Sequence, residues 1–263
     1  MPTKWKILKH RIRLFGEKNE MLKKSLRWWD YRRSIRKSRL KTLGRAKAFR
    51  ECYELHRTEF YKLYELLEDD FSRRTLRNVI KYRLTARTSL LRGIVVSPQY
   101  FVPDIIGPLK EEVFIDGGAY TGDMIASLYR ERGKCWRKIY AWEPDEENRR
   151  ILEKRCVDYK DVEIIPFALW KEKTELKFLA GKEVGSRISE NGTEVVPVDT
   201  IDHVCSSDKV TFIKMDIEGS ELEALRGAAD VIRRDKPKLA ISIYHKPKDY
   251  FEIPFFVKPI LLS

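Results

Sequence analysis

Short apolar runs alternate with helix-like segments over the second half of the chain, and no other feature of the sequence constrains the fold as strongly. Such alternation predicts an α/β fold, a mostly parallel sheet with helices on both faces. The predicted strands are Val113–Asp116, Lys138–Trp142, Val162–Pro166, Thr211–Met215 and Lys238–Tyr244. The expected helices run from the glycine loop to about Arg132, from about Glu146 to Val157, and from Glu221 to Arg233. Glu175–Leu179 and Glu194–Val198 are expected to form an inserted hairpin or edge pair.

The first 110 residues differ in charge from the rest. They contain 28 Lys and Arg against 11 Asp and Glu, whereas residues 111–263 contain 25 against 29. The net charge of +13 therefore belongs to the N-terminal part, for which we expect helices, with Ser72 as one N-cap. Prolines and glycines near residues 98–108 indicate a linker. We predict a basic helical extension over 1–110 and an α/β domain over 111–263.

Several classes of protein are excluded by composition. No run of about 18 apolar residues suggests a membrane helix, and no apolar core of a signal peptide follows the N-terminus. The four cysteines form no C-x-x-C pair, so neither a disulfide framework nor a zinc knuckle is indicated. A cytoplasmic location, with possible association to a membrane surface, is the expectation.

A glycine loop follows the first predicted strand. Gly118 and Gly122 allow a sharp turn and close approach of a ligand, but the loop lacks the G-x-G-x-x-G spacing of dinucleotide sites. Asp116 at the strand end suits a positive ligand group, such as the ammonium of an amino acid. Glu143 follows the next strand, where an acid commonly binds the two ribose hydroxyls of an adenosine.

These segments resemble the FkbM family of S-adenosylmethionine-dependent methyltransferases, which have a Rossmann-like fold. The resemblance covers about residues 58–256 and is carried by Phe114–Asp123, Tyr140–Pro144, Val196–Asp202, Ile213–Glu221 and Tyr244–Asp249. It implies S-adenosylmethionine as cofactor, with the methionine part near Gly118, the ribose on Glu143 and the adenine near 167–169. The implied cofactor-binding residues are Asp116, Gly117, Gly118, Ala119, Tyr120, Gly122, Glu143, Pro144, Phe167, Ala168, Leu169 and Asp216.

An acidic loop and a histidine follow the last two predicted strands. Ligands bind beyond the carboxyl ends of parallel strands, so Asp216, Glu218 and His245 are the candidate catalytic residues. Asp216 or His245 would help to deprotonate an acceptor hydroxyl, and Glu218 would position it. Ser220 and Glu223 fit a capping box, and Glu221 fits either the site or the first turn of a helix. The acidic cluster could instead hold Mg²⁺ through oxygen ligands, but no spacing demands a metal, and no metal-binding residue is predicted.

Only 19 residues follow Tyr244, fewer than a helix and two strands require. Since the family usually adds those elements to its sheet, we expect the chain to be C-terminally short relative to the family, or to complete its sheet with a partner.

The resemblance favours O-methylation of a hydroxyl on a sugar, glycan or secondary metabolite. One alternative is a catalytically weak or inactive binding module that docks through its basic arm. A nucleic-acid methyltransferase is a third reading, which the net negative charge of residues 111–263 disfavours. Residues 1–50 fit a solvated extension, a segment that binds anionic membrane surfaces, or a segment that binds an acidic protein or a nucleic acid.

Overall fold

A computed structural model describes residues 44–95, 100–101, 107, 109–179 and 187–263. Of residues 1–50, only 44–50 are described, as helix, so most of this segment lies outside the described residues. Within the described part, no helix is both long and apolar enough to cross a membrane.

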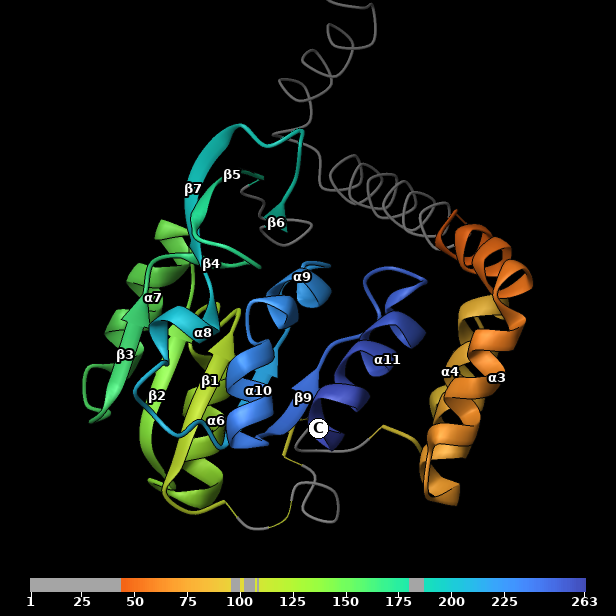
Figure 1. Ribbon diagram of the computed structural model, residues 1–263, viewed down its shortest axis with the longest axis horizontal. Coiled ribbons are helices and arrows are strands. Elements are labelled where there is room, and N and C mark those ends of the chain that lie inside the picture. The colour runs from red at the N-terminus through yellow and green to blue at the C-terminus, as the bar shows by residue number, and fades with distance from the viewer. Residues whose placement is uncertain (1–43, 96–99, 102–106, 108, 180–186) are drawn as a thin grey trace, which may run out of the picture. The chain divides into compact units, whose positions relative to one another are not determined.

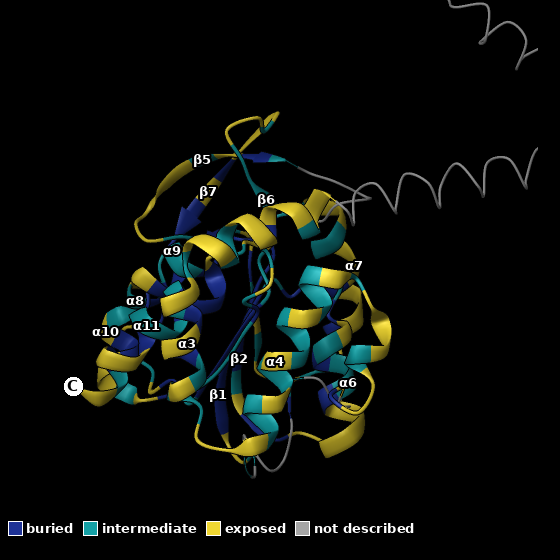
Figure 2. Cartoon of the chain, turned by 90° about the vertical axis from the view of Figure 1, so that its right-hand side faces the viewer, coloured by how far each residue is buried: buried dark blue, intermediate teal, exposed yellow. Residues whose placement is uncertain are grey.

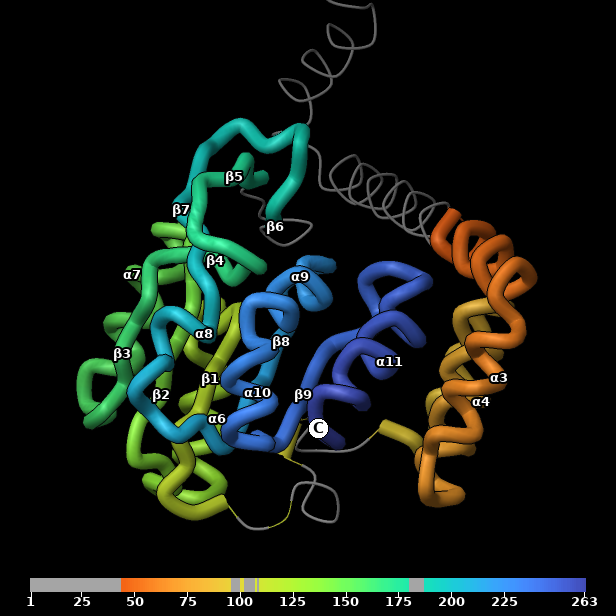
Figure 3. The backbone as a smooth tube through the Cα atoms, viewed as in Figure 1, coloured from red at the N-terminus to blue at the C-terminus, as the bar shows by residue number. Residues whose placement is uncertain are grey.

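A five-stranded, fully parallel sheet forms the centre of the α/β part, as predicted. Its strand order is β3-β2-β1-β8-β9, so β1 pairs with β2 on one side and with the distant β8 on the other (Figure 3). The strands are β1 (Glu112–Gly117), β2 (Trp136–Trp142), β3 (Val162–Ile165), β8 (Phe212–Met215) and β9 (Lys238–Ile241). From β1 the chain first adds strands on one side of the sheet, β2 and β3, and later on the other side, β8 and β9. The strand order therefore reverses between β1 and β8, and ligands of open α/β sheets bind at such a point.

Alternate residues of the strands face two separate cores, as a period of two requires. Val113 and Ile115 pack into one core with four helices, whereas Phe114 packs into the other with two. The first group comprises α8 (Ile201–Val204), α9 (Glu221–Arg226), α10 (Ala229–Asp235) and α11 (Asp249–Leu262). The second comprises α6 (Asp123–Arg132) and α7 (Glu146–Cys156). Figures 1 and 2 show the buried strands between these helical layers, which confirms the predicted architecture.

A second, four-stranded sheet has the order β4-β7-β5-β6. β5 and β7 pair in antiparallel orientation, which confirms the expected pairing, but they are the two central strands of this sheet and not an edge pair. The strands are β4 (Ala168–Leu169), β5 (Thr174–Leu179), β6 (Arg187–Ile188) and β7 (Glu194–Asp199). Because β4 contains two of the residues expected near adenine, this sheet contributes directly to the candidate site.

The described residues divide into two compact units, one formed by 44–55 with 75–91, the other by 56–74 with the described part of 92–263. In the first, Phe49 is fully buried and the Arg83 guanidinium lies 5.4 Å from its ring centroid. In the second, α3 (Arg57–Leu66) packs on α11, with the Phe60 and Phe251 rings 5.5 Å apart. α4 (Asp70–Thr85) and the 3-10 turn η1 (Thr88–Leu91) follow α3. The predicted domain boundary near residue 110 stays a prediction.

Two predicted helix starts are wrong in detail. Helix α4 begins at Asp70, and Asp69 caps it by accepting hydrogen bonds from the backbone N–H and hydroxyl of Ser72. Ser72 is therefore the capped residue and not the cap. Ser220 does precede α9, but its side chain makes no capping hydrogen bond, so the predicted capping box is not formed.

The predicted helix over Glu221–Arg233 is two helices, α9 and α10, with a break at Gly227. A Cβ at Gly227 would lie 2.3 Å from the carbonyl oxygen of Trp170, so this contact requires glycine. The last strand ends at Ile241, three residues earlier than predicted, although the Ser242 N–H still donates to the Met215 carbonyl (2.9 Å).

Candidate functional site

A cavity of about 770 Å³ opens at the carboxyl ends of β1 and β8, where the sheet order reverses. Its volume is in the range of small-molecule sites. Among the residues predicted for cofactor or catalysis, those that line it are Gly118, Ala119, Tyr120, Glu143, Pro144, Phe167, Ala168, Leu169, Asp216 and Glu218. The predicted residues that do not line it are Asp116, Gly117, Gly122 and His245.

The glycine loop brings the ends of β1 and β8 unusually close together. Gly118 has a φ of +73°, and a Cβ on it would lie 2.2 Å from the carbonyl oxygen of Asp216. Gly122 has a φ of +77°, and its Cβ would lie 2.7 Å from Leu152 Cδ1 on α7. Gly118 therefore requires glycine for conformation and for space, whereas at Gly122 only the positive φ requires it, because the Leu152 methyl group is the end of a side chain that can shift.

A buried ion pair lies beneath this loop. The Lys214 ammonium is 2.9 Å from Asp116 Oδ1 and also donates to the carbonyls of Gly117 (3.2 Å) and Gly118 (2.9 Å). Burial raises the pKa of Asp116, and the charge of Lys214 opposes that rise. Since Asp116 is fully buried, its ammonium partner is this lysine side chain, and its carboxylate does not reach the cavity.

Glu143 is a buried carboxylate at the edge of the cavity. Its Oε2 accepts the Tyr120 N–H (2.9 Å) and its Oε1 accepts the Asp145 N–H (3.0 Å), which holds the side chain in one orientation. Burial raises the pKa of Glu143 to about 7, against the lowering effect of these two hydrogen bonds. A carboxylate oriented in this way can accept hydrogen bonds from two hydroxyl groups of a ligand.

Two of the six described non-glycine residues with a positive φ lie at the same cavity. Tyr120 and Glu218 both line it, and both have a positive φ, of +51° and +57°. Non-glycine residues in this region are uncommon and often mark ligand sites.

Asp216 accepts hydrogen bonds from three side chains. Tyr100 donates to Oδ2 (2.9 Å), Tyr244 contacts both oxygens (3.0 Å), and Nε2 of His245 lies 2.8 Å from Oδ1. Burial raises the pKa of Asp216, but hydrogen bonds from His245 and the two tyrosines outweigh it and hold the value at about 2. Asp216 is therefore an ionised acceptor at neutral pH.

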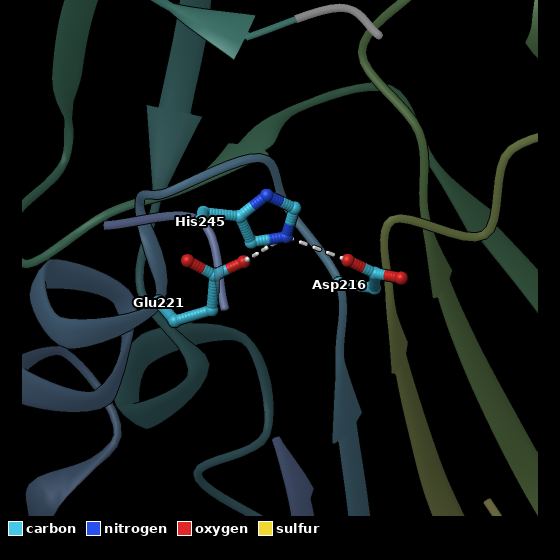
Figure 4. A group of neighbouring side chains, drawn as sticks. All are labelled: Asp216, Glu221 and His245. Carbon is cyan, nitrogen blue, oxygen red and sulfur yellow. Dashed lines mark hydrogen bonds and ion pairs between the residues drawn. The ribbon is translucent and has the colours of Figure 1, made fainter. Parts of the chain in front are cut away.

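His245 lies behind Asp216, enclosed by carboxylates. Its Nε2 is 3.4 Å from Glu221 Oε1, and its Nδ1 is 3.5 Å from Glu218 Oε2. Figure 4 shows the ring between Asp216 and Glu221, which come from the ends of β8 and the start of α9. Burial lowers the pKa of His245, but these carboxylates reverse the effect and raise it overall. The predicted catalytic residues thus lie together, although only Asp216 and Glu218 line the cavity.

Three further residues of the site were missed by sequence reasoning. Lys214 had a usable signal, since a lysine inside the apolar strand Phe212–Met215 needs a buried partner. Tyr244 directly precedes His245 and could have been included with it. Tyr100 carried no local signal, because its contact with Asp216 spans 116 residues of sequence.

The charge of the cavity favours a cationic ligand. Among the described lining residues, six are carboxylates and the one cation, Lys214, is already paired with Asp116. The carboxylates are Asp123, Glu143, Asp145, Glu147, Asp216 and Glu218. A ligand with positive groups and ribose-type hydroxyls matches this lining better than a pyrophosphate.

Comparison with known proteins identifies a family. Residues 116–258 match the model of the methyltransferase FkbM domain. The crystal structure of methyltransferase FkbM from Methylobacillus flagellatus KT is similar at 28% sequence identity and a TM-score of 0.66. The similarity covers 79% of this chain and 53% of that one, so the chain spans about half the length of the solved protein. No curated protein matches the chain.

Proposed function

The chain belongs to the FkbM methyltransferase family, and we propose from this premise that it transfers a methyl group from S-adenosylmethionine to a hydroxyl group. The acceptor we propose is a sugar, a glycan or a secondary metabolite. One observation supports the proposal above all others: the glycine loop and buried Glu143 lie on one cavity at the reversal of strand order.

The lining of the cavity fits the proposed cofactor. Glu143 would accept hydrogen bonds from the ribose hydroxyls, and the backbone at Gly118 and Ala119 would lie along the methionine part. Phe167 and Leu169 offer apolar surface for the adenine. The excess of carboxylates suits a ligand with a sulfonium and an ammonium group.

When bound, S-adenosylmethionine supplies an already activated methyl group, so the protein mainly has to align the acceptor and promote loss of its proton. Asp216 faces the cavity and is ionised, which allows it to accept a hydrogen bond from an acceptor hydroxyl. His245 and the two tyrosines fix the orientation of that carboxylate. Glu218 lines the same wall and would hold a second polar group of the acceptor.

Calorimetric titration with S-adenosylmethionine tests cofactor binding. The wild-type protein should bind one equivalent, and Glu143→Ala should weaken binding at least about tenfold, or 1.4 kcal/mol. Glu175→Ala serves as the matched control, because Glu175 is an exposed glutamate on β5 away from the cavity. No heat from the wild-type protein would remove the proposal.

Methyl transfer to a panel of sugars and hydroxylated metabolites tests the second half of the proposal. Asp216→Ala and His245→Ala should each lower turnover while cofactor binding persists. Full transfer by both variants would show that these residues do not assist the reaction. Cofactor binding without turnover on any acceptor would instead favour the binding-module reading.

Residues 1–50 keep their three readings as predictions. Sedimentation with liposomes, with and without anionic lipid, separates membrane binding from a solvated extension, since only the first depends on the lipid charge.

A further inference from the structure

We propose that Asp216, Glu221 and His245 form a binding site for a divalent transition-metal ion of the Mn²⁺ or Zn²⁺ class. The role of the ion in catalysis rests on the proposed function, but its binding does not. The site joins two elements that are separate in sequence: the loop between β8 and α9, and the segment after β9.

The two donor distances from His245 fit a metal centre. Nε2 of His245 lies 2.8 Å from Asp216 Oδ1 and 3.4 Å from Glu221 Oε1, and the three donor atoms lie within 4.8 Å of one another (Figure 4). Metal–ligand bonds of about 2.1 Å place neighbouring ligands roughly 3.0–3.4 Å apart in octahedral and tetrahedral sites. The two distances to His245 are close to this range.

The surroundings of the three residues also match those of metal ligands. A metal-bound histidine usually directs its other ring nitrogen to a carboxylate or carbonyl, and Nδ1 of His245 lies 3.5 Å from Glu218 Oε2. A ligating carboxylate is usually held by hydrogen bonds as well, and Asp216 receives them from Tyr100 and Tyr244. Both features would keep the donor atoms aimed at one point.

Charge balance at the histidine provides an independent argument. Three carboxylates lie within 3.5 Å of its ring, and a protonated imidazole compensates only one of them. Glu221 is fully buried, and its Oε2 has no hydrogen-bond partner among the described residues. A buried carboxylate needs a positive charge beside it. A divalent ion bound to a neutral imidazole supplies two positive charges, whereas a protonated imidazole supplies one.

The donor set selects the class of ion. One imidazole with two carboxylates suits Mn²⁺, Fe²⁺ or Zn²⁺, whereas Mg²⁺ and Ca²⁺ prefer oxygen ligands alone. Because Asp216 also lines the cavity, an ion held there would lie beside the acceptor and lower the pKa of its hydroxyl group.

The direct test is titration of the EDTA-treated full chain with MnCl₂, followed by the electron paramagnetic resonance signal of free Mn²⁺. We expect one Mn²⁺ per chain, with binding weakened at least about tenfold by Glu221→Gln and by His245→Gln. His203→Gln is the matched control, because His203 forms a similar pair with Asp199 (3.0 Å) on β7, away from the cluster. Its Mn²⁺ affinity should equal that of the wild type.

Two outcomes would overturn the proposal. In the first, the wild-type protein binds neither Mn²⁺ nor Zn²⁺ at millimolar concentration. A protonated His245 would then be the group that balances the charge of the carboxylates. The second is an equal loss of affinity in the His203 control. Circular dichroism checks that each variant folds. If either Glu221→Gln or His245→Gln does not fold, the Mn²⁺ affinity of the other variant decides. The Mn²⁺ titration contains neither S-adenosylmethionine nor acceptor. A negative result would therefore overturn the metal site alone, whereas a negative calorimetric titration would overturn the proposed function.

Discussion

Gly118→Ala is the substitution whose effect follows most directly from the geometry. The new Cβ would lie 2.2 Å from the Asp216 carbonyl oxygen, 3.1 Å from the carbonyl carbon and 3.2 Å from Ile217 Cγ2. Two costs add at this position. Alanine at a φ of +73° costs about 1–2 kcal/mol, and the forced separation of two packed backbones costs about 1–3 kcal/mol more. The free energy of unfolding should therefore fall by about 2–5 kcal/mol.

A matched control separates the two costs. Gly93 has a φ of +76°, but a Cβ there meets nothing within 4 Å. Gly93→Ala should therefore lose only the conformational part, about 1–2 kcal/mol. Gly118→Ala should also weaken S-adenosylmethionine at least about tenfold, because the loop and Asp216 would move apart, whereas Gly93→Ala should leave binding unchanged.

Urea unfolding followed by tryptophan fluorescence measures the first quantity, and calorimetric titration measures the second. The two variants should differ in unfolding free energy by at least about 1 kcal/mol. Equal losses in both would mean that the close approach of β1 and β8 does not constrain the loop, and the reasoning would be refuted.

Three further outcomes follow from buried polar groups and helix caps. Folding raises the pKa of Glu143 from 4.5 to about 7, so the folded state binds one more proton between these pH values. The free energy of unfolding should therefore fall by about 3 kcal/mol as the pH rises from 4.5 to about 7. In urea titrations Glu143→Gln should remove this fall, and a pH dependence unchanged by the substitution would contradict the assignment. Lys214→Met leaves Asp116 buried without its cation and should cost about 3–5 kcal/mol of unfolding free energy, and a loss below about 1 kcal/mol would mean that the pair is not desolvated. Ser220→Ala should cost under about 0.5 kcal/mol because Ser220 makes no capping bond, whereas Thr200→Ala should cost about 1 kcal/mol because Thr200 caps α8, and the reverse order would restore the capping box.

The parts of the fold that follow from local rules were predictable from the sequence. A period of two in Val113, Phe114 and Ile115 assigns alternate residues to opposite cores, and the structure has them there. The glycine positions were equally readable, because the positive φ of Gly118 and Gly122 is a conformation that other residues adopt at a cost. Local pattern was enough for these features because their physical cause is local.

Features that depend on distant partners were not predictable. The glycine at the helix break, Gly227, is required by its close contact with a carbonyl of Trp170, which lies 57 residues away. Asp116 looked like a ligand group because nothing near it in sequence revealed Lys214 as its partner, 98 residues later. In both cases the competing interaction is tertiary, and it overrides a correct local preference.

Glu221 fits two interpretations in the sequence, a member of the site or a first-turn residue that suits the helix dipole. The structure places it in the first turn of α9 and also beside His245, fully buried. Its Oε1 accepts the Ile217 N–H (2.9 Å) and lies 3.4 Å from Nε2 of His245, which follows β9. The cluster of Asp216, Glu221 and His245 thus joins the loop after β8 to the segment after β9, and no pattern local to either segment reveals that they meet.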